Sequence, residues 1–111
     1  RPQSMAASLR VLARAAAKDA VIGDMAELGE LTERAHKEIG ELTKELGIDT
    51  VIAIGARAKY FTEGNPSAQW FRSVDEAIGA VKAAFTAETA MLVKASRSMH
   101  FEKIVEELTK A

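Results

Sequence analysis

The sequence contains no cysteine, so it can form neither a disulfide bond nor a thiolate metal site. It has no apolar run long enough to span a bilayer and no signal-peptide pattern. An excess of charge of one sign is also absent, since the formal net charge of the 111 residues is -1. These absences argue against a membrane or a nucleic acid as partner, and they lead us to expect a cytoplasmic protein.

Sequence motifs for common nucleotide-binding and hydrolase sites are missing as well. The segment Gly23-Asp24-Met25 is not the glycine-rich loop of a dinucleotide-binding protein, and no P-loop occurs. There is no nucleophile elbow and no pair of histidines at metal-ligand spacing. We therefore expect no catalytic residue, no metal ligand and no cofactor held by this chain alone.

The residues that are present fit one globular domain over 1–111. Hydrophobic residues make up 48% of the chain and charged residues 28%, which is an ordinary balance for a protein with one core. The chain begins at Arg1-Pro2-Gln3 without an initiator methionine. Two interpretations of this start stay open, namely a piece of a longer protein and a trimmed terminus.

Four short apolar segments are predicted to be β-strands. Residues 50–54 form a continuous, β-branched run, which is typical of a strand covered on both faces. Residues 90–93 form a similar run and are expected to be buried too. The predicted strands are 20–22, 50–54, 69–71 and 90–93.

Apolar residues at helical spacing predict helices before, between and after these strands. Gly47 is expected to end the second helix, Ser73 and Glu76 are expected to form the capping box of the fourth, and the fifth follows Arg97. The apolar faces of these helices include Leu31, Phe85 and Val105. The first three predicted helices cover about 4–17, 29–46 and 56–63.

Strands that alternate with amphipathic helices indicate an α/β fold. Right-handed crossovers then give a Rossmann-like, three-layer domain, with a mostly parallel sheet of about four to five strands and helices on both faces. The order of the strands is not determined by this pattern. An exposed edge strand of such a sheet would allow a weak homodimer.

Polar residues follow the predicted strands at the edge where ligands bind to open parallel sheets. Cations together with helix N-termini form anion sites, so this edge is a candidate site for an anion or a carboxylate. The alternative is that these residues are polar because loops are exposed to water. The residues concerned are Asp24, Arg57, Arg72, Ser73, Lys94, Ser96 and Arg97.

The two histidines and the acidic segment after the first strand have simpler interpretations. His36 lies on the flank of a helix stripe, and we expect it to be a packing residue rather than a base. His100 is expected to be solvated. Glu27 and its neighbouring glutamates suit the dipole at the start of a helix. Asp24 is the better functional candidate, because it directly follows a buried strand.

Three segments resemble one protein family. They are VIGDMAELGELTERAHKEIG at 21–40, LGIDTVIAIG at 46–55 and LVKASRSMHFEKIVEEL at 92–108. Together they resemble the C-terminal domain of the Mur ligases, of the type that adds D-Ala-D-Ala to UDP-N-acetylmuramoyl-tripeptide. The resemblance extends over essentially the whole chain, and the Gly-Asp-Met-x-Glu-Leu-Gly segment is fairly specific to this type.

The resemblance implies a role in peptidoglycan precursor synthesis. Such ligases have three domains, use ATP and magnesium to activate the carboxylate of the UDP-linked tripeptide, and join it to the amine of D-Ala-D-Ala. The third domain closes over the site and helps to hold the dipeptide. Because the first two domains are absent from this chain, we expect it to be inactive alone and to bind no cofactor alone.

The resemblance also implies site residues. Asp24 and Glu27 match the acidic loop of the family, and His36 matches the helix that follows it. The last strand-to-helix motif of the family is matched by Lys94, Ser96 and Arg97. The expected substrate-binding residues are Asp24, Glu27, Lys94, Ser96 and Arg97, with His36 and Arg57 as supporting residues.

Arg1 stands where the family has an asparagine before the proline, and Ala95 stands where the family motif has glycine. A positive φ at Ala95 would cost on the order of 1 kcal/mol. These departures keep an alternative open, in which the chain is a stand-alone or engineered α/β scaffold without catalysis. A small receiver or flavin-binding domain is a third interpretation, and it is disfavoured because Asp24 lacks an adjacent acidic partner.

Overall fold

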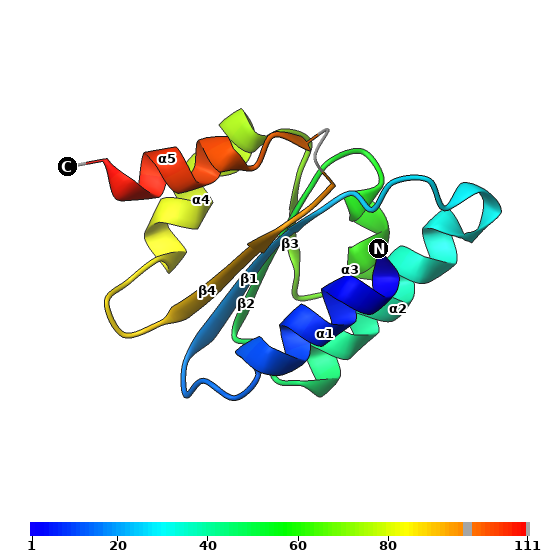
Figure 1. The fold of residues 1–111 in the computed structure, drawn as a ribbon, viewed down its shortest axis with the longest axis horizontal. Helices are drawn as coiled ribbons and strands as arrows, with labels where there is room; N and C mark the ends of the chain where they lie inside the picture. The colour runs from blue at the N-terminus through cyan, green and yellow to red at the C-terminus, as the bar shows by residue number, and fades with distance from the viewer. Residues whose placement is uncertain (97–98, 111) are drawn as a thin grey trace.

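A computed structural model describes residues 1–96 and 99–110 and has a parallel sheet of four strands. The sheet confirms the expected α/β class, and its strand order is β3-β2-β1-β4 (Figure 1). The expected strands all form, and β1 begins two residues earlier than expected. The strands are β1 (Lys18–Gly23), β2 (Thr50–Ile54), β3 (Gln69–Phe71) and β4 (Ala90–Lys94).

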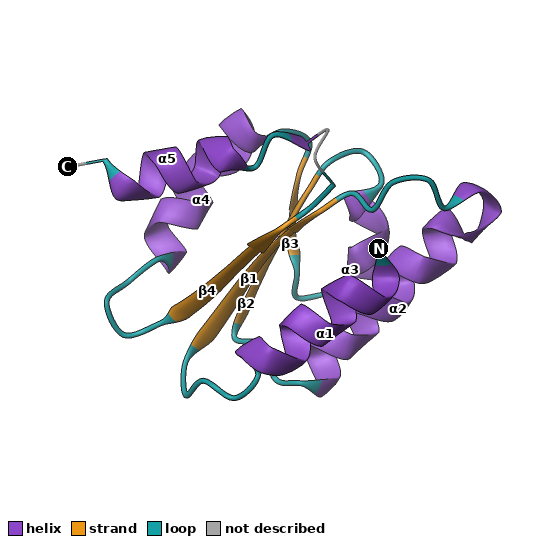
Figure 2. Ribbon diagram, in the orientation of Figure 1, coloured by secondary structure: helices purple, strands orange, loops and turns teal. Residues whose placement is uncertain are grey.

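Helices cover both faces of this sheet, so the domain has three layers (Figure 2). One face carries α1 (Pro2–Leu12), α2 (Thr32–Glu45) and α3 (Phe61–Gly64), and the other carries α4 (Val74–Ala84) and α5 (Glu102–Thr109). Two 3-10 turns, η1 (Gly29–Leu31) and η2 (Ala58–Tyr60), precede α2 and α3.

Successive residues of the central strands face opposite halves of the core. Ala20 and Ile22 pack in the cluster beneath α1, α2 and α3, whereas Val21 packs in the cluster beneath α4 and α5. The parallel register pairs Ile22 with both Ala53 and Lys94. The carboxyl ends of β1, β2 and β4 are therefore level, and the loops that follow them share one edge.

The first helix is shorter than the predicted 4–17, because α1 ends at Leu12. The reason is that the chain enters the sheet early. The Lys18 N–H donates to the Asp49 carboxylate at 2.9 Å, and the Ala17 carbonyl accepts from the Ala90 N–H at 2.9 Å. These contacts between distant segments override the helical preference of the alanines before Lys18.

Burial of β4 was predicted wrongly. Its residues are half-buried or exposed, because β4 lies at the edge of the sheet and has β1 as its one neighbour among the described strands.

The inward orientation predicted for three apolar side chains is also wrong. Leu31 lies in η1 and Phe85 is the extended residue after α4, while Val105 lies on the outer side of α5.

The predicted helix ends are present, with one difference. Gly47 has a φ of +65° just after α2, as expected of a residue that ends a helix. The Ser73 hydroxyl accepts from the Glu76 N–H at 3.3 Å. The Glu76 carboxylate, however, accepts from the N–H of Arg72 rather than from that of the cap residue. The residue before the cap is thereby fastened to α4.

Two glycines allow α2 and α3 to approach closely. A Cβ atom on Gly40 would lie 2.0 Å from the carbonyl oxygen of Phe61, and one on Gly64 would lie 2.0 Å from that of Lys37. Main-chain atoms cannot move aside as a flexible side chain can. Glycine is therefore required on both helices of this contact.

We expect Gly40→Ala to lower the free energy of unfolding by about 1–3 kcal/mol, because α3 must move away from α2. The matched control is Gly79→Ala in α4, where an added Cβ meets no atom within 4 Å. That change should raise stability by about 0.5–1 kcal/mol. Urea unfolding followed by the fluorescence of Trp70, the single tryptophan, measures both. Equal effects of the two substitutions would contradict the close contact.

Candidate functional site

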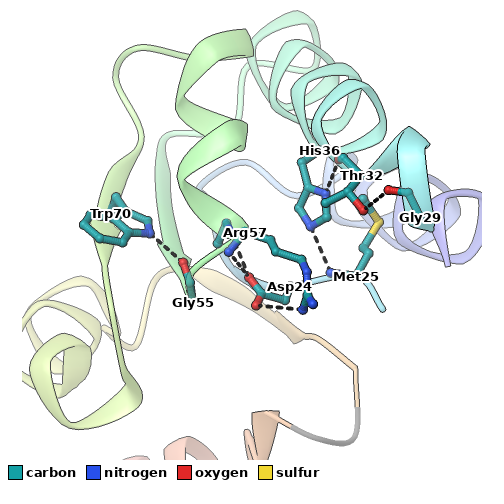
Figure 3. A network of polar contacts seen from close by, with 9 residues as sticks. Asp24, Met25, Gly29, Thr32, His36, Gly55, Arg57 and Trp70 are labelled. Atoms are coloured by element: carbon teal, nitrogen blue, oxygen red, sulfur yellow. Dashed lines mark hydrogen bonds and ion pairs between the residues drawn. The ribbon is translucent and has the colours of Figure 1, made fainter. Parts of the chain in front are cut away.

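Asp24 directly follows β1 and binds the main chain after β2 (Figure 3). Its Oδ1 accepts from the N–H groups of Arg57 at 3.0 Å and Ala58 at 2.8 Å. Its Oδ2 lies 3.7 Å from the Arg57 guanidinium. The side chain is only 8% exposed. The carboxylate therefore caps the turn that opens η2 and ties the ends of the two central strands together.

Gly55 permits this close approach between the two loops. Its φ is +125°, and a Cβ atom there would lie 2.4 Å from Oδ1 of Asp24. The Gly55 N–H donates to the Phe71 carbonyl at 2.9 Å, and the Gly55 carbonyl accepts from Trp70 Nε1 at 2.7 Å. The carboxyl ends of β2 and β3 are thus joined as firmly as those of β1 and β2.

His36 extends from α2 into the loop after β1 (Figure 3). Its Nδ1 lies 2.6 Å from the Thr32 carbonyl, and its Nε2 lies 3.0 Å from the Met25 nitrogen. A carbonyl can only accept and a main-chain N–H can only donate. Nδ1 therefore carries the proton, Nε2 accepts, and the ring is neutral.

The surroundings of His36 favour this neutral form. The side chain is fully buried, and its ring centroid lies 4.9 Å from that of Phe61. Burial lowers the pKa of His36 below its usual value of 6.5, and the Arg57 charge lowers it further, while the Thr32 carbonyl and the Asp24 charge act in the opposite direction. His36 is thus a buried packing residue, as expected, and it also has a hydrogen-bonding role.

The loop between β1 and η1 has an unusual main-chain conformation. Glu27 has a φ of +61° and Gly29 a φ of +55°. Met25 is buried at 2% exposure and Leu28 packs against the core, so the loop is anchored on both sides of Glu27. The Glu27 side chain is exposed to solvent. The loop therefore holds one carboxylate inside, that of Asp24, and presents another outside.

The chain after β4 contacts the same loop. The Ser96 N–H donates to the Asp24 carbonyl at 3.2 Å, which joins the loops that follow β1 and β4. A Cβ atom on Gly23 would lie 2.7 Å from that of Ala95 and 2.6 Å from the Phe101 ring, so the crevice between these strands is closely packed. Ala95 does not have a positive φ, and the cost considered for it does not arise.

The structure thus brings most of the sequence candidates to one edge. Asp24, His36 and Arg57 form one connected group, and the Ser96 main chain joins it. Lys94 is half-buried and lies at the end of β4, level with Ile22. Arg97, the remaining candidate, lies outside the described residues.

Sequence reasoning missed a hollow at this edge and the ion pair that borders it. Lys103 Nζ lies 2.6 Å from the Asp75 carboxylate, and this bond raises the pKa of Lys103 above its usual value. No local signal could have indicated this pair, because it joins α4 to α5 across 28 positions. The hollow has a volume of about 320 Å³ and is lined by Arg72, Ser73, Val74, Asp75, Met99 and Lys103.

Two further features concern the part of the chain that the structure describes. Histidine and acidic side chains do not converge there in a group of three that could hold a metal ion. No helix within the described ranges is long and apolar enough to cross a membrane.

The chain is similar in sequence to the members of one protein family. Residues 1–97 match the family described as Mur ligase, glutamate ligase domain. Over 108 residues the chain is 33% identical to the UDP-N-acetylmuramoyl-tripeptide–D-alanyl-D-alanine ligase of Escherichia coli (strain K12). That match covers 95% of this chain and 24% of the ligase, so the chain spans about a quarter of its relative's length.

Solved structures of similar proteins have the same fold. MurF from Acinetobacter baumannii superimposes with a TM-score of 0.87 at 28% identity, over 97% of this chain and 26% of that one. MurF ligase from Thermotoga maritima, solved in complex with ADP, gives a TM-score of 0.83 over 96% of this chain and 25% of that one. Its identity of 24% limits that likeness to the fold.

We expect Asp24→Ala to lower the free energy of unfolding by about 2–3 kcal/mol, because two main-chain N–H groups lose a charged acceptor. Asp24→Asn retains an oxygen that can accept and should cost about half as much. Chemical denaturation measures both, with Glu30→Ala at an exposed position of the next turn as the control, which should change stability by less than about 0.5 kcal/mol. An equal cost for the alanine and asparagine variants would argue against the capping role.

The stability of the protein should fall as the pH is lowered below about 6.5, the usual pKa of histidine. Because the pKa of His36 is lower in the folded state than in the unfolded state, the unfolded state takes up more protons as the pH falls through this window. Urea unfolding between pH 7.5 and about 5 measures the slope. His36→Leu should flatten it, whereas His100→Gln, a change of the exposed histidine, should not. A slope unaffected by His36→Leu would contradict the assignment.

Proposed function

The chain belongs to the Mur ligase family, as a domain of the glutamate ligase type, and we propose that it is the C-terminal domain of a cytoplasmic ligase that adds D-Ala-D-Ala to UDP-N-acetylmuramoyl-tripeptide. The observation that carries this proposal is the match to the E. coli ligase of that name over 95% of the chain. The energy of the reaction comes from ATP, with magnesium, at a site completed by the other domains of such a ligase.

The role of this domain is to supply one wall of the site. Catalysis of this kind depends on holding two substrates in place between domains, so the chain alone forms no amide bond. D-Ala-D-Ala carries a carboxylate at one end and an ammonium at the other. The carboxyl edge of the sheet offers side chains of both signs to such a molecule.

The cations suit the carboxylate end of the dipeptide. The Arg57 side chain is 57% exposed while its main chain is fixed by Asp24, and Lys94 lies at the end of β4 on the same edge. A charged hydrogen bond to a carboxylate is stronger than a neutral one. Ser96 and Arg97 belong to the same proposed wall, following the family motif that they match.

Binding of D-Ala-D-Ala to the chain tests the wall directly. Amide shifts in an NMR titration with D-Ala-D-Ala, then with Mg-ATP, should saturate at residues 23–29 and 94–98 and should be small elsewhere. Arg57→Gln should weaken binding, whereas Arg14→Gln, a change in the loop before β1, should not. The dipeptide L-Ala-L-Ala serves as the ligand control, because it has the same charges with the opposite chirality.

Activity tests the complete function. We expect a chimera, in which this chain replaces the matching quarter of the E. coli ligase, to release phosphate from ATP in a manner that depends on D-Ala-D-Ala and to form the amide. The E. coli ligase truncated before that quarter should be inactive. A folded chimera without amide formation, together with an absence of shifts in the titration, would overturn the proposed function.

A further inference from the structure

The conformation of the loop at residues 24–29 depends on one buried hydrogen bond to the main chain. The Met25 N–H donates to His36 Nε2 at 3.0 Å, and both residues are buried. Neighbouring Asp24 binds the chain after β2 through its carboxylate and the chain after β4 through its carbonyl. Two successive residues are therefore fixed to three other segments of the protein.

The same contacts leave little of the Asp24 carboxylate open to a ligand. Oδ1 already accepts from two N–H groups, Oδ2 lies 3.7 Å from the Arg57 guanidinium, and the side chain is 8% exposed. A substrate ammonium could reach this carboxylate only by displacing its partners. Such a displacement would leave buried N–H groups without an acceptor, which is unfavourable.

Glu27 has the opposite environment in the same loop. Its side chain is exposed, and it takes part in none of the described hydrogen bonds or ion pairs. Its φ of +61° is rare for a residue with a side chain, and the buried Met25 and the half-buried Leu28 anchor the loop on either side of it. The loop thus presents the Glu27 carboxylate at the edge where the proposed dipeptide site lies.

We propose that His36 and Asp24 are positioning residues, and that the carboxylate which they position for the ammonium of the incoming dipeptide is that of Glu27. This inference rests on the proposed function, because it assigns roles within that site. It changes the role that the sequence indicated for Asp24, from contact with substrate to support of the loop.

The Met25 N–H makes the neutral form of His36 a requirement of this arrangement, because Nε2 must accept from it. Asp24 faces His36 from the end of β1 and Arg57 from the turn before η2, while Phe61 of α3 covers its ring. A second proton on the ring would replace the acceptor at Nε2 by a donor that points at the Met25 N–H. The loop would then lose its fixed conformation without any change in Glu27 itself.

Two substitutions of His36 separate positioning from packing. His36→Gln retains an oxygen near the place of Nε2, and it should retain slow hydrogen exchange at Met25 and most of the wild-type shifts at Glu27. His36→Leu retains the packing against Phe61 but has no acceptor. It should lose that protection and weaken D-Ala-D-Ala binding roughly three- to tenfold, while far-UV circular dichroism stays unchanged.

Two substitutions of glutamate test the contact with the ammonium. Glu27→Gln should weaken binding of D-Ala-D-Ala roughly three- to tenfold, whereas the matched control Glu30→Gln, an exposed glutamate three residues later, should not change it. N-acetyl-D-Ala-D-Ala has the same carboxylate but no ammonium. The binding of this analogue should be insensitive to Glu27→Gln.

The outcomes distinguish failure of this inference from failure of the proposed function. Saturable shifts at 94–96 with D-Ala-D-Ala, unaffected by Glu27→Gln or His36→Leu, would overturn the assignment and leave the function standing. If the N-acetyl analogue loses as much affinity as D-Ala-D-Ala on Glu27→Gln, the carboxylate does not recognise the ammonium. An absence of shifts with an inactive chimera would remove the function and this inference together.

Discussion

The buried carboxylate of Asp24 is the contact on which the carboxyl edge of the sheet depends. A carboxylate in a residue that is only 6% exposed is stable only when its lost hydration is replaced, and here two N–H groups and a guanidinium replace it. Those partners lie 33 and 34 positions away, so the bond fixes the end of β1 against the end of β2. Gly55 is needed because any side chain there would meet the same carboxylate. The position of Arg57, the main cation of the proposed wall, follows from it.

The features of the fold that could be predicted from the sequence are those fixed by local physics. Apolar runs, helical periodicity and the residues at helix ends indicate the strands, most helices, the stop at Gly47 and the start of α4 at Ser73. The strand order depends on which crossover packs on which face, and this is not local. Without that order, β4 could not be recognised as an edge strand, and its burial was overestimated. The orientation of Val105 was predicted wrongly. Its spacing fits the apolar stripe of α5, but the residues of α5 that pack inward are Ile104 and Leu108.

The candidate site, too, has features that could be predicted from the sequence and features that could not. The place of Asp24, first after a buried strand, was sufficient to select it, because polar residues at that edge of a parallel sheet have a known use. Its actual role was not visible, since the acceptor geometry depends on the turn at Arg57 in another part of the chain. His36 was recognised as a buried packing residue, but its bond to Met25 joins residues 11 positions apart around a loop of irregular shape. Periodicity carries no information about such a loop.

A rigid edge suits a domain that contributes a wall to a site shared between domains. Ordering a loop or a side chain on binding costs roughly 0.5–1.5 kcal/mol for each flexible side chain, and that cost is subtracted from affinity. Here the ordering has taken place during folding, through Asp24, His36 and the Trp70–Gly55 bond. The left-handed conformation of Glu27 costs on the order of 1–3 kcal/mol and persists because Met25 and Leu28 anchor the loop against the core. The stability of the core thus maintains a strained loop, and under the proposed function this loop holds the Glu27 carboxylate in place before the dipeptide binds.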